Sequence, residues 1–305
     1  MPDVLVVGSI NQDFVLRVER RPQPGETVTG AELSLHGGGK GANQAAAAAL
    51  LGARVAFLGR VGDDAFGKEL VRELGETGVD TSLVSSAEGV HTGTAFITVT
   101  PDGENAITVA PGANRALSPT DVDLAWRRLG GLSVVVCQME IPLACVEQAA
   151  RLARKSGARF VLNLAPPSRI PEDLLRSTDI LVVNEHEVAF LLGREVEGVG
   201  GASRATGELL ARGPGSAVVT LGASGAVVAA PGDVRHVPAP RVEAVDTTAA
   251  GDAFVGALAA RLAAGADLAG AVSHAVAAGA ITVTRAGARS SLPSAAEVGS
   301  LVPDV

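Results

Sequence analysis

The stretch AVDTTAAGDAFVGALAARL, residues 244–262, places a single carboxylate, Asp252, directly after three residues with almost no side chain. The residues after it have the amphipathic pattern of a helix. A helix N-terminus presents unpaired backbone N–H groups and the positive end of the helix dipole, so small residues there let an anion approach, with Asp252 beside it. The alternative is that Asp252, or Asp246 upstream, only caps the helix, as Asp commonly does. Taken alone, the stretch favours the cap.

A second candidate site is HGGGKGANQAAAAALLG, residues 36–52. Its glycines permit positive φ angles and close approach of a ligand to the backbone, and we expect a helix from about Ala42. A dinucleotide fingerprint needs an acidic residue about 20 positions later, at the end of the second strand. That strand ends FLGR, and the first acids, Asp63 and Asp64, lie beyond it. The remaining alternatives are a flexible loop with a solvated Lys40 and a ligand site, which Asn43 favours.

Three further stretches are less specific. GDDAFGKE (62–69) begins like a phosphate-binding P-loop, but Glu69 stands where Ser or Thr must hold magnesium, so a turn is predicted. VVNEHEVAFLLG (182–193) spaces Asn184 and Glu187 as in a capping box. AVVTLGASGAVVAA (217–230) reads as two strands whose turn gathers hydrogen-bond donors and bare backbone.

Buried strands must position these groups. Short apolar runs alternate with helical patterns, which indicates a parallel sheet covered on both faces. The runs are VLVVG (4–8), VAFLG (55–59), VVVCQME (134–140), FVLNLAP (160–166), ILVVN (180–184) and AVVTLG (217–222). Ligands bind at the carboxyl ends of such strands. The polar residues that fall there are Asn11, Asp13, Glu140, Asn163 and Asn184.

Two segments alternate apolar and polar residues instead, which is typical of strands with one wet face. They lie at about 13–36 and 91–112, and the second is a predicted hairpin with Asp102-Gly103 near its turn. We expect them to form a small sheet, a lid, inserted into a single domain that spans residues 1–305.

Composition limits the possible partners. The chain has 305 residues, 47% of them hydrophobic, and a formal net charge of -8. This balance argues against nucleic acid or an anionic membrane as a partner, but a local site can still hold an anionic substrate. Cys137 and Cys145 do not form a CxxC pair and read as reduced, buried thiols. The apolar run at the N-terminus is too short for a signal peptide, and no stretch is long enough to span a bilayer. We therefore expect a soluble, cytoplasmic protein.

Taken together, these stretches closely resemble the ribokinase-like (phosphofructokinase-B) family of sugar kinases. The resemblance covers nearly the whole chain in order, through GSINQDF, PGETVTG, GGGKGANQA, ME at 139–140, NLAPP, VVNEHE, VVTLGASGA, VDTTAAGDAF and ITVTRAGARSSLP. The implied fold is an α/β three-layer sandwich, with a central mostly parallel sheet and a small β-sheet lid. Relatives often dimerise through that lid, so a homodimer is expected.

The resemblance also implies roles for individual residues. Asp252 would take the proton from the sugar's primary hydroxyl, and the amides of Ala249, Ala250 and Gly251 would form an anion hole, which decides against a simple cap. The sugar site would comprise Asn11, Gln12, Asp13, Gly39, Lys40, Gly41, Ala42, Asn43, Glu140 and Asp252. The nucleotide site would comprise Asn184, Thr220, Leu221, Gly222, Ala223, Ser224, Gly225 and Gly251. Glu187 would orient magnesium-bound water, and potassium would be held by Asp246, Thr248, Thr282, Arg285, Gly287 and Ser291.

The activity implied is ATP-dependent phosphorylation of D-ribose to D-ribose 5-phosphate, with Mg²⁺ and K⁺. Other family substrates, namely 2-deoxyribose, fructose or a nucleoside such as adenosine, are the nearest alternatives. A non-catalytic sugar sensor is disfavoured, because a protein that only binds sugar could lose Asp252, Lys40 or the bare anion hole.

Overall fold

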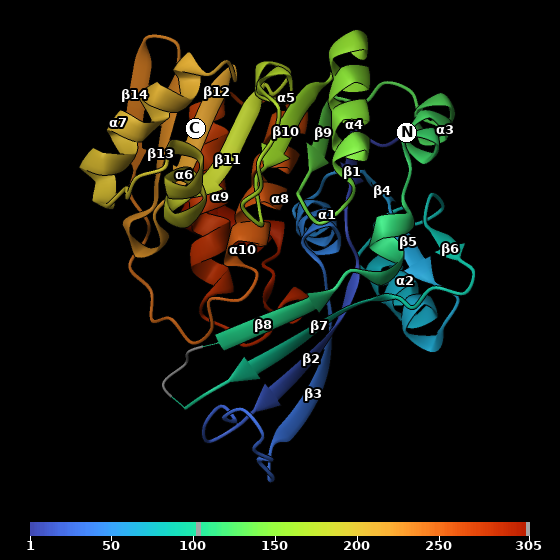
Figure 1. Ribbon diagram of the computed structural model, residues 1–305. Coiled ribbons are helices and arrows are strands. Elements are labelled where there is room, and N and C mark those ends of the chain that lie inside the picture. The colour runs from blue at the N-terminus through green and yellow to red at the C-terminus, as the bar shows by residue number, and fades with distance from the viewer. Residues whose placement is uncertain (102–104, 303–305) are drawn as a thin grey trace.

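The computed structural model describes residues 1–101 and 105–302, and the predicted Asp102-Gly103 turn lies outside them. In this part of the chain the central sheet has eight strands (Figure 1). In spatial order they are β14 (Asp233–Val237), β13 (Ala226–Ala230), β12 (Ser216–Thr220), β11 (Ile180–Asn184), β10 (Arg159–Asn163), β9 (Val134–Cys137), β1 (Val4–Val7) and β4 (Val55–Leu58). All neighbours pair in parallel except β12 with β13 and β13 with β14. The predicted, mostly parallel sheet is confirmed.

Helices cover both faces of this sheet (Figure 1). One face packs against α1 (Lys40–Leu50), α8 (Ala250–Ala263) and α9 (Leu268–Thr282). The other packs against α3 (Pro119–Arg128), α4 (Leu143–Ser156) and α7 (Gly198–Ala211). Shorter segments complete the layers: α2 (Ala65–Glu76), α5 (Glu172–Arg176), α6 (Glu185–Leu192), α10 (Ala295–Leu301) and the 3₁₀ turns η1 (Gly112–Ala116), η2 (Gly222–Ser224) and η3 (Arg289–Ser291).

The contact between α1 and α8 is unusually close because both helices present small residues. A Cβ added at Gly256 of α8 would lie 2.5 Å from the Cβ of Ala47 in α1. Helix α1 begins at Lys40 rather than near Ala42, because Gly39, with φ +87°, ends the preceding strand and serves as N-cap. The same Gly39 lies against the backbone of Ile10, 2.7 Å from where a Cβ would stand. The first turn of α1 is thereby fixed beside the loop that follows β1.

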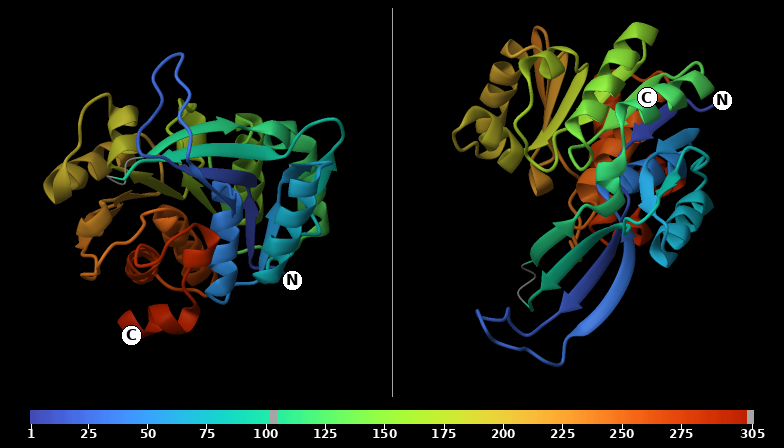
Figure 2. Two further views of the ribbon diagram at one scale, coloured as in Figure 1. Left: turned by 90° about the horizontal axis from the view of Figure 1, so that it is seen from below. Right: turned by 45° about the vertical axis from the view of Figure 1, so that its right-hand side comes forward.

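A four-stranded second sheet extends away from the α/β body (Figure 2). Its order is β3 (Glu32–Gly38), β2 (Asn11–Arg17), β7 (Gly93–Val99) and β8 (Asn105–Ala110). These strands come from the two segments that alternate in the sequence, and we call them the lid sheet. On the lid-sheet face that carries Phe14, its ring stacks on Phe96 at 5.2 Å. The paired strands β5 (Arg60–Gly62) and β6 (Ser85–Ala87) were not predicted, because runs of three residues carry no period.

Two further expectations concern the chain as a whole. In the described residues, no helix has both the length and the apolar character needed to cross a membrane. Cys137 and Cys145 are buried free thiols, as predicted.

Candidate active site

Two adjoining cavities share Thr247 in their lining; one lies at the carboxyl ends of central strands and the other lies against the lid sheet. The smaller, of about 230 Å³, gathers the start of α8 and the ends of β10, β11 and β12. Its lining includes Lys40, Asn163, Asn184, Glu187, Thr220, Ala249, Gly251 and Asp252. The structure thus brings together residues predicted for the base, the anion hole and the nucleotide.

The N-terminus of α8 is left open. Its N-cap is Ala249, whose φ of +61° makes it, within the described chain, the one residue other than glycine with a positive φ. An alanine in the left-handed region is strained, and such strain is typical of functional sites. No side chain among the described residues caps this helix. Ala249, Gly251 and Asp252 line the smaller cavity, while the Ala250 amide donates to the Thr247 carbonyl at 3.3 Å. The start of α8 therefore faces a cavity, which is the arrangement that an anion needs.

Asp252 does not cap the helix. Its side chain is buried and accepts hydrogen bonds from two neighbours on α1, Asn43 Nδ2 on Oδ2 and Gln44 Nε2 on Oδ1, each at 3.0 Å. The cap interpretation is wrong, and the carboxylate instead stands inside the cavity beside the helix start.

Lys40 supplies the positive charge of the site. Burial lowers the pKa of its ammonium group, but the carboxylates of Asp252, Glu140, Glu187 and Asp13 together raise the pKa above its usual value. Lys40 therefore stays protonated at neutral pH and faces the same cavity as Asp252.

The larger cavity, of about 630 Å³, lies between the lid sheet and residues 244–248 and 286–288. Asp13 and His36 enter it from paired positions on β2 and β3. Burial and the nearby Glu140 raise the pKa of Asp13 to about 7, although Arg289 and Lys40 oppose them.

In the glycine-rich segment, the backbone amides form hydrogen bonds that position the start of helix α1. Glu140 accepts from Lys40 N at 3.1 Å and from the Ser9 hydroxyl. Ser9 in turn accepts from Gly41 N at 3.3 Å, through Oγ, and from Ala42 N at 2.9 Å, through its carbonyl. The backbone amides of Gly41 and Ala42, predicted to contact sugar, are thus already engaged.

Two other predicted sugar residues also have protein partners. Gln12 donates from Nε2 to the His36 carbonyl at 3.0 Å, which ties β2 to β3. Asn11 accepts at Oδ1 from Asn114 Nδ2 at 2.7 Å. The Asn114 side chain also accepts from Ile10 N, so it fixes the loop after β1.

On the nucleotide side, Asn184 and Glu187 form the capping box that their spacing indicates. Asn184 Oδ1 accepts from Glu187 N, and Glu187 Oε2 accepts from Asn184 N, each at 2.8 Å. Both residues also line the smaller cavity with Thr220. Of the rest of the predicted set, Gly251 lies at the start of α8. The others lie in the turn after β12, where Gly222, Ala223 and Ser224 are exposed and Leu221 and Gly225 are buried.

Three of the predicted potassium residues, Asp246, Thr248 and Gly287, are joined by hydrogen bonds. Asp246 accepts from Thr248 N and Gly287 N, each at 2.9 Å, which joins the loop before α8 to the loop after α9. Burial raises the pKa of Asp246, but these hydrogen bonds outweigh it and hold the pKa below its usual range. Thr282 and Ser291 are fully buried, and the Arg285 side chain pairs with Glu297.

Sequence reasoning missed several buried polar residues. Gln44 and Gln138 join Asp252 and Asn163 in one network, and Arg289 extends from η3 to donate to the Gly38 carbonyl at 3.2 Å. The sequence signal for Gln44 is that it follows Asn43, so two amide side chains stand directly before a run of alanines.

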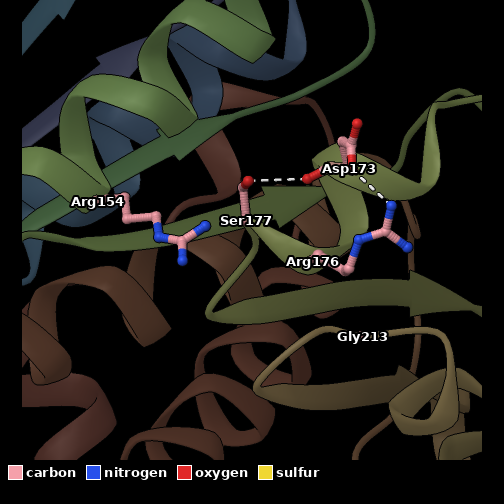
Figure 3. Close-up of a pocket in the computed structure, with 5 residues that line it drawn as sticks. All are labelled: Arg154, Asp173, Arg176, Ser177 and Gly213. Atoms are coloured by element: carbon pink, nitrogen blue, oxygen red, sulfur yellow. Dashed lines mark hydrogen bonds and ion pairs between the residues drawn. The ribbon is translucent and has the colours of Figure 1, made fainter.

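A separate hollow of about 560 Å³ lies over α5 (Figure 3). Its lining is Arg154, Asp173, Arg176, Ser177 and Gly213. Arg176 is paired with Asp173 and the Ser177 hydroxyl donates to the Asp173 carbonyl, while Arg154 is exposed.

Comparison with known proteins decides the family. The model of the pfkB family carbohydrate kinases matches residues 1–295. The chain belongs to the pfkB family of carbohydrate kinases. It therefore transfers a phosphoryl group to a sugar hydroxyl, and the family predicted from the sequence is confirmed.

Individual relatives are similar over their whole length. Ribokinase of Haemophilus influenzae is 40% identical over 292 residues, 96% of this chain and 95% of that protein. Deoxyribokinase of Salmonella typhi is 36% identical over 293 residues, 96% of either protein. The structure of Arabidopsis thaliana ribokinase complexed with ribose and ATP superimposes with a TM-score of 0.90 at 33% identity, covering 100% of this kinase and 99% of that chain.

The open helix start gives a first prediction. A Cβ at Gly251 meets no atom of the described chain within 4 Å, so Gly251→Ala fits without a clash. Alanine favours a helix over glycine by about 1 kcal/mol, so the melting temperature should hold or rise. The methyl group occupies space before the amides, and we expect kcat to fall by about 10²-fold, as when an oxyanion donor is lost. Gly207→Ala, an equally open position in α7, is the matched control. Undiminished kcat in Gly251→Ala would contradict the anion hole.

The raised pKa of Asp13 gives a second prediction. If the ionised carboxylate accepts sugar hydroxyls, sugar affinity weakens as pH falls below about 7, by up to about tenfold per pH unit. Acid unfolding would not cause this loss of sugar affinity. The pKa of Asp13 is higher in the folded than in the unfolded protein, so this carboxyl stabilises the folded state as the pH falls below about 7. Calorimetric titration with sugar at about pH 8 and about pH 6 measures the effect. Asp13→Asn should bind weakly with this pH dependence removed; a flat profile in the unaltered kinase would contradict the role.

Proposed function

We propose that this kinase transfers the γ-phosphoryl group of ATP to the primary hydroxyl of D-ribose and releases D-ribose 5-phosphate and ADP. The observation that carries the proposal is the buried Asp252, held by two amides beside an uncapped helix N-terminus. The relatives named above support ribose and ATP as substrates.

The step needs positioning and charge stabilisation more than covalent chemistry. As the sugar oxygen forms its bond to the γ-phosphorus, its proton passes to the Asp252 carboxylate. The bond from that phosphorus to the β–γ bridging oxygen breaks, and its electron pair leaves with ADP. The amides from Ala249 to Gly251 and the charge of Lys40 stabilise the oxygens of the transferred group.

The sugar would lie where the two cavities meet. Asn43 donates to Asp252, but its Oδ1 is buried without a partner among the described residues, so it can accept from a sugar hydroxyl. Asp13 offers carboxylate oxygens to adjacent hydroxyls in the same way. Asn11 and Glu140 complete this set, and their hydrogen bonds to Asn114 and Ser9 hold them in place.

Magnesium fits the site through oxygen donors. In the described chain no group of three or more His, Cys, Asp or Glu residues could hold a metal, so the ion would rely on phosphates and water, as Mg²⁺ often does. Glu187, buried at the cavity wall, is the residue that would orient such water. When bound, magnesium would neutralise phosphate charge.

Potassium fits the loop around Asp246 for the same chemical reason, because the candidate ligands there are carboxylate, hydroxyl and backbone carbonyl oxygens. Bound there, the ion would hold residues 246–248, and with them the anion hole, in shape. We expect kcat to rise when potassium replaces a bulky organic cation at constant ionic strength. An unchanged rate would remove the cation site.

The lid sheet would also carry a homodimer interface. Leu33, Leu35 and Phe96 are each about half exposed and lie on its face opposite the cavity. Apolar area of this kind is typical of an interaction surface. Sedimentation velocity should show a dimer that Leu35→Arg dissociates, and a monomeric unaltered protein would contradict this arrangement.

The substrate assignment is tested by a coupled assay of ADP release across D-ribose, 2-deoxyribose, fructose and adenosine. We expect D-ribose to give the highest kcat/KM. A higher value for another acceptor would overturn the substrate while leaving the kinase mechanism intact. Binding of ribose without ADP release would instead favour the sensor.

A further inference from the structure

A buried chain of side-chain amides ends on Asp252. Gln138, directly after β9, donates from Nε2 to Gln44 Oε1 at 2.6 Å. Gln44 donates from Nε2 to Asp252 Oδ1 and to Asn163 Oδ1, each at 3.0 Å. Gln44 and Gln138 are each 1% exposed, so water does not replace these contacts. One amide therefore links α1, the ends of β9 and β10, and the start of α8.

The charge on Asp252 determines which amide groups donate and which accept in this series of hydrogen bonds. An ionised carboxylate only accepts, so Gln44 must turn its NH₂ group toward Asp252 and its oxygen toward Gln138. Gln138 must then donate, which leaves its own Oε1 buried without a partner among the described residues. An unsatisfied buried acceptor is unfavourable. The hydrogen bonds that orient the Asp252 carboxylate therefore leave an unsatisfied acceptor on Gln138.

Gln44 differs in this respect from its neighbour Asn43. Asn43 has a buried oxygen, Oδ1, without a partner among the described residues. In Gln44, the two N–H groups donate to Asp252 and Asn163, and the oxygen accepts from Gln138. The Gln44 amide therefore has no donor left for a sugar hydroxyl. Its oxygen keeps a second lone pair, but the side chain is 1% exposed and lines neither cavity. We therefore expect its effect on the reaction to pass through the groups that it holds.

We propose that Gln44, supported by Gln138, is a positioning residue that fixes the plane of the Asp252 carboxylate. Asn43 holds one oxygen and Gln44 the other, so the remaining lone pairs face the acceptor hydroxyl. The inference rests on the proposed role of Asp252 as the base. Without Gln44 the carboxylate can rotate, and small displacements of a reacting group reduce rate far more than ground-state binding.

The test is Gln44→Met, which keeps the length of the side chain and removes all three hydrogen bonds. We expect kcat with ribose and ATP to fall about 10- to 100-fold, with the ribose KM within about threefold of the unaltered value. Gln148→Met, a buried glutamine on α4 that bonds Asp123, is the matched control and should keep its kcat. A kcat within about twofold of the unaltered enzyme, with only the melting temperature lowered, would make Gln44 purely structural. A rise in ribose KM as large as the fall in kcat would also overturn the proposal.

Gln138→Met gives a second arm that leaves Asp252 and Gln44 in place, so it remains informative if Gln44→Met does not fold. It should lower kcat in the same sense but by less, about three- to tenfold, with ribose KM unchanged. In an Asp252→Asn background, Gln44→Met should reduce kcat no further, because residues that act as a unit are not additive. An additional loss there would overturn action through Asp252. Failure of the proposed function is distinct, because the unaltered enzyme would then be inactive with ribose.

Discussion

The site depends on the close approach of helix α1 to helix α8. Alanines on α1 and Gly256 on α8 allow side chains at their first turns to meet, so Asn43 and Gln44 reach Asp252. A larger residue at Gly256 would collide with Ala47 and the α1 backbone. The small residues of these two helices therefore set the distance between Asp252 and the two amides that hold it, as well as filling the core.

The second constraint is electrostatic. Asp13, Glu140, Glu187 and Asp252 all act on Lys40, and an anionic substrate adds to their charge. Two features balance this negative charge. One is the protonated Lys40, whose pKa these carboxylates raise, and the other is the uncapped N-terminus of α8. Asp13 is left with a pKa of about 7, because burial and the neighbouring carboxylates outweigh the opposing charges of Arg289 and Lys40.

Much of this architecture could be predicted from the sequence, because it rests on local patterns. Apolar runs predicted the central strands except β14, whose sequence DVRHV lies outside every run. Alternation predicted the lid sheet, and small residues before Asp252 marked the helix start. Gln44 could not be assigned in this way, because its partner Asp252 lies 208 residues away and burial of an amide depends on which helix comes to cover it. For Gly41 and Ala42 the motif predicts a place in the sugar site, but the bonds of their amides to Ser9 could not be predicted, because Ser9 lies more than 30 residues away in the sequence. The spacing of Asn184 and Glu187 is compatible with a capping box and with a ligand site. In the structure the two residues form the capping box and also line the smaller cavity.

The most direct test of this account is the rate of phosphoryl transfer in a single turnover by Asp252→Asn, with saturating ribose and ATP. The amide keeps the size of the side chain but presents a donor to Asn43 or Gln44, so stability should fall by about 1–3 kcal/mol while ribose still binds. The account predicts a rate about 10²–10⁴-fold lower than that of the unaltered enzyme, the usual contribution of a general base. A rate within about twofold, with ribose affinity retained, would contradict it.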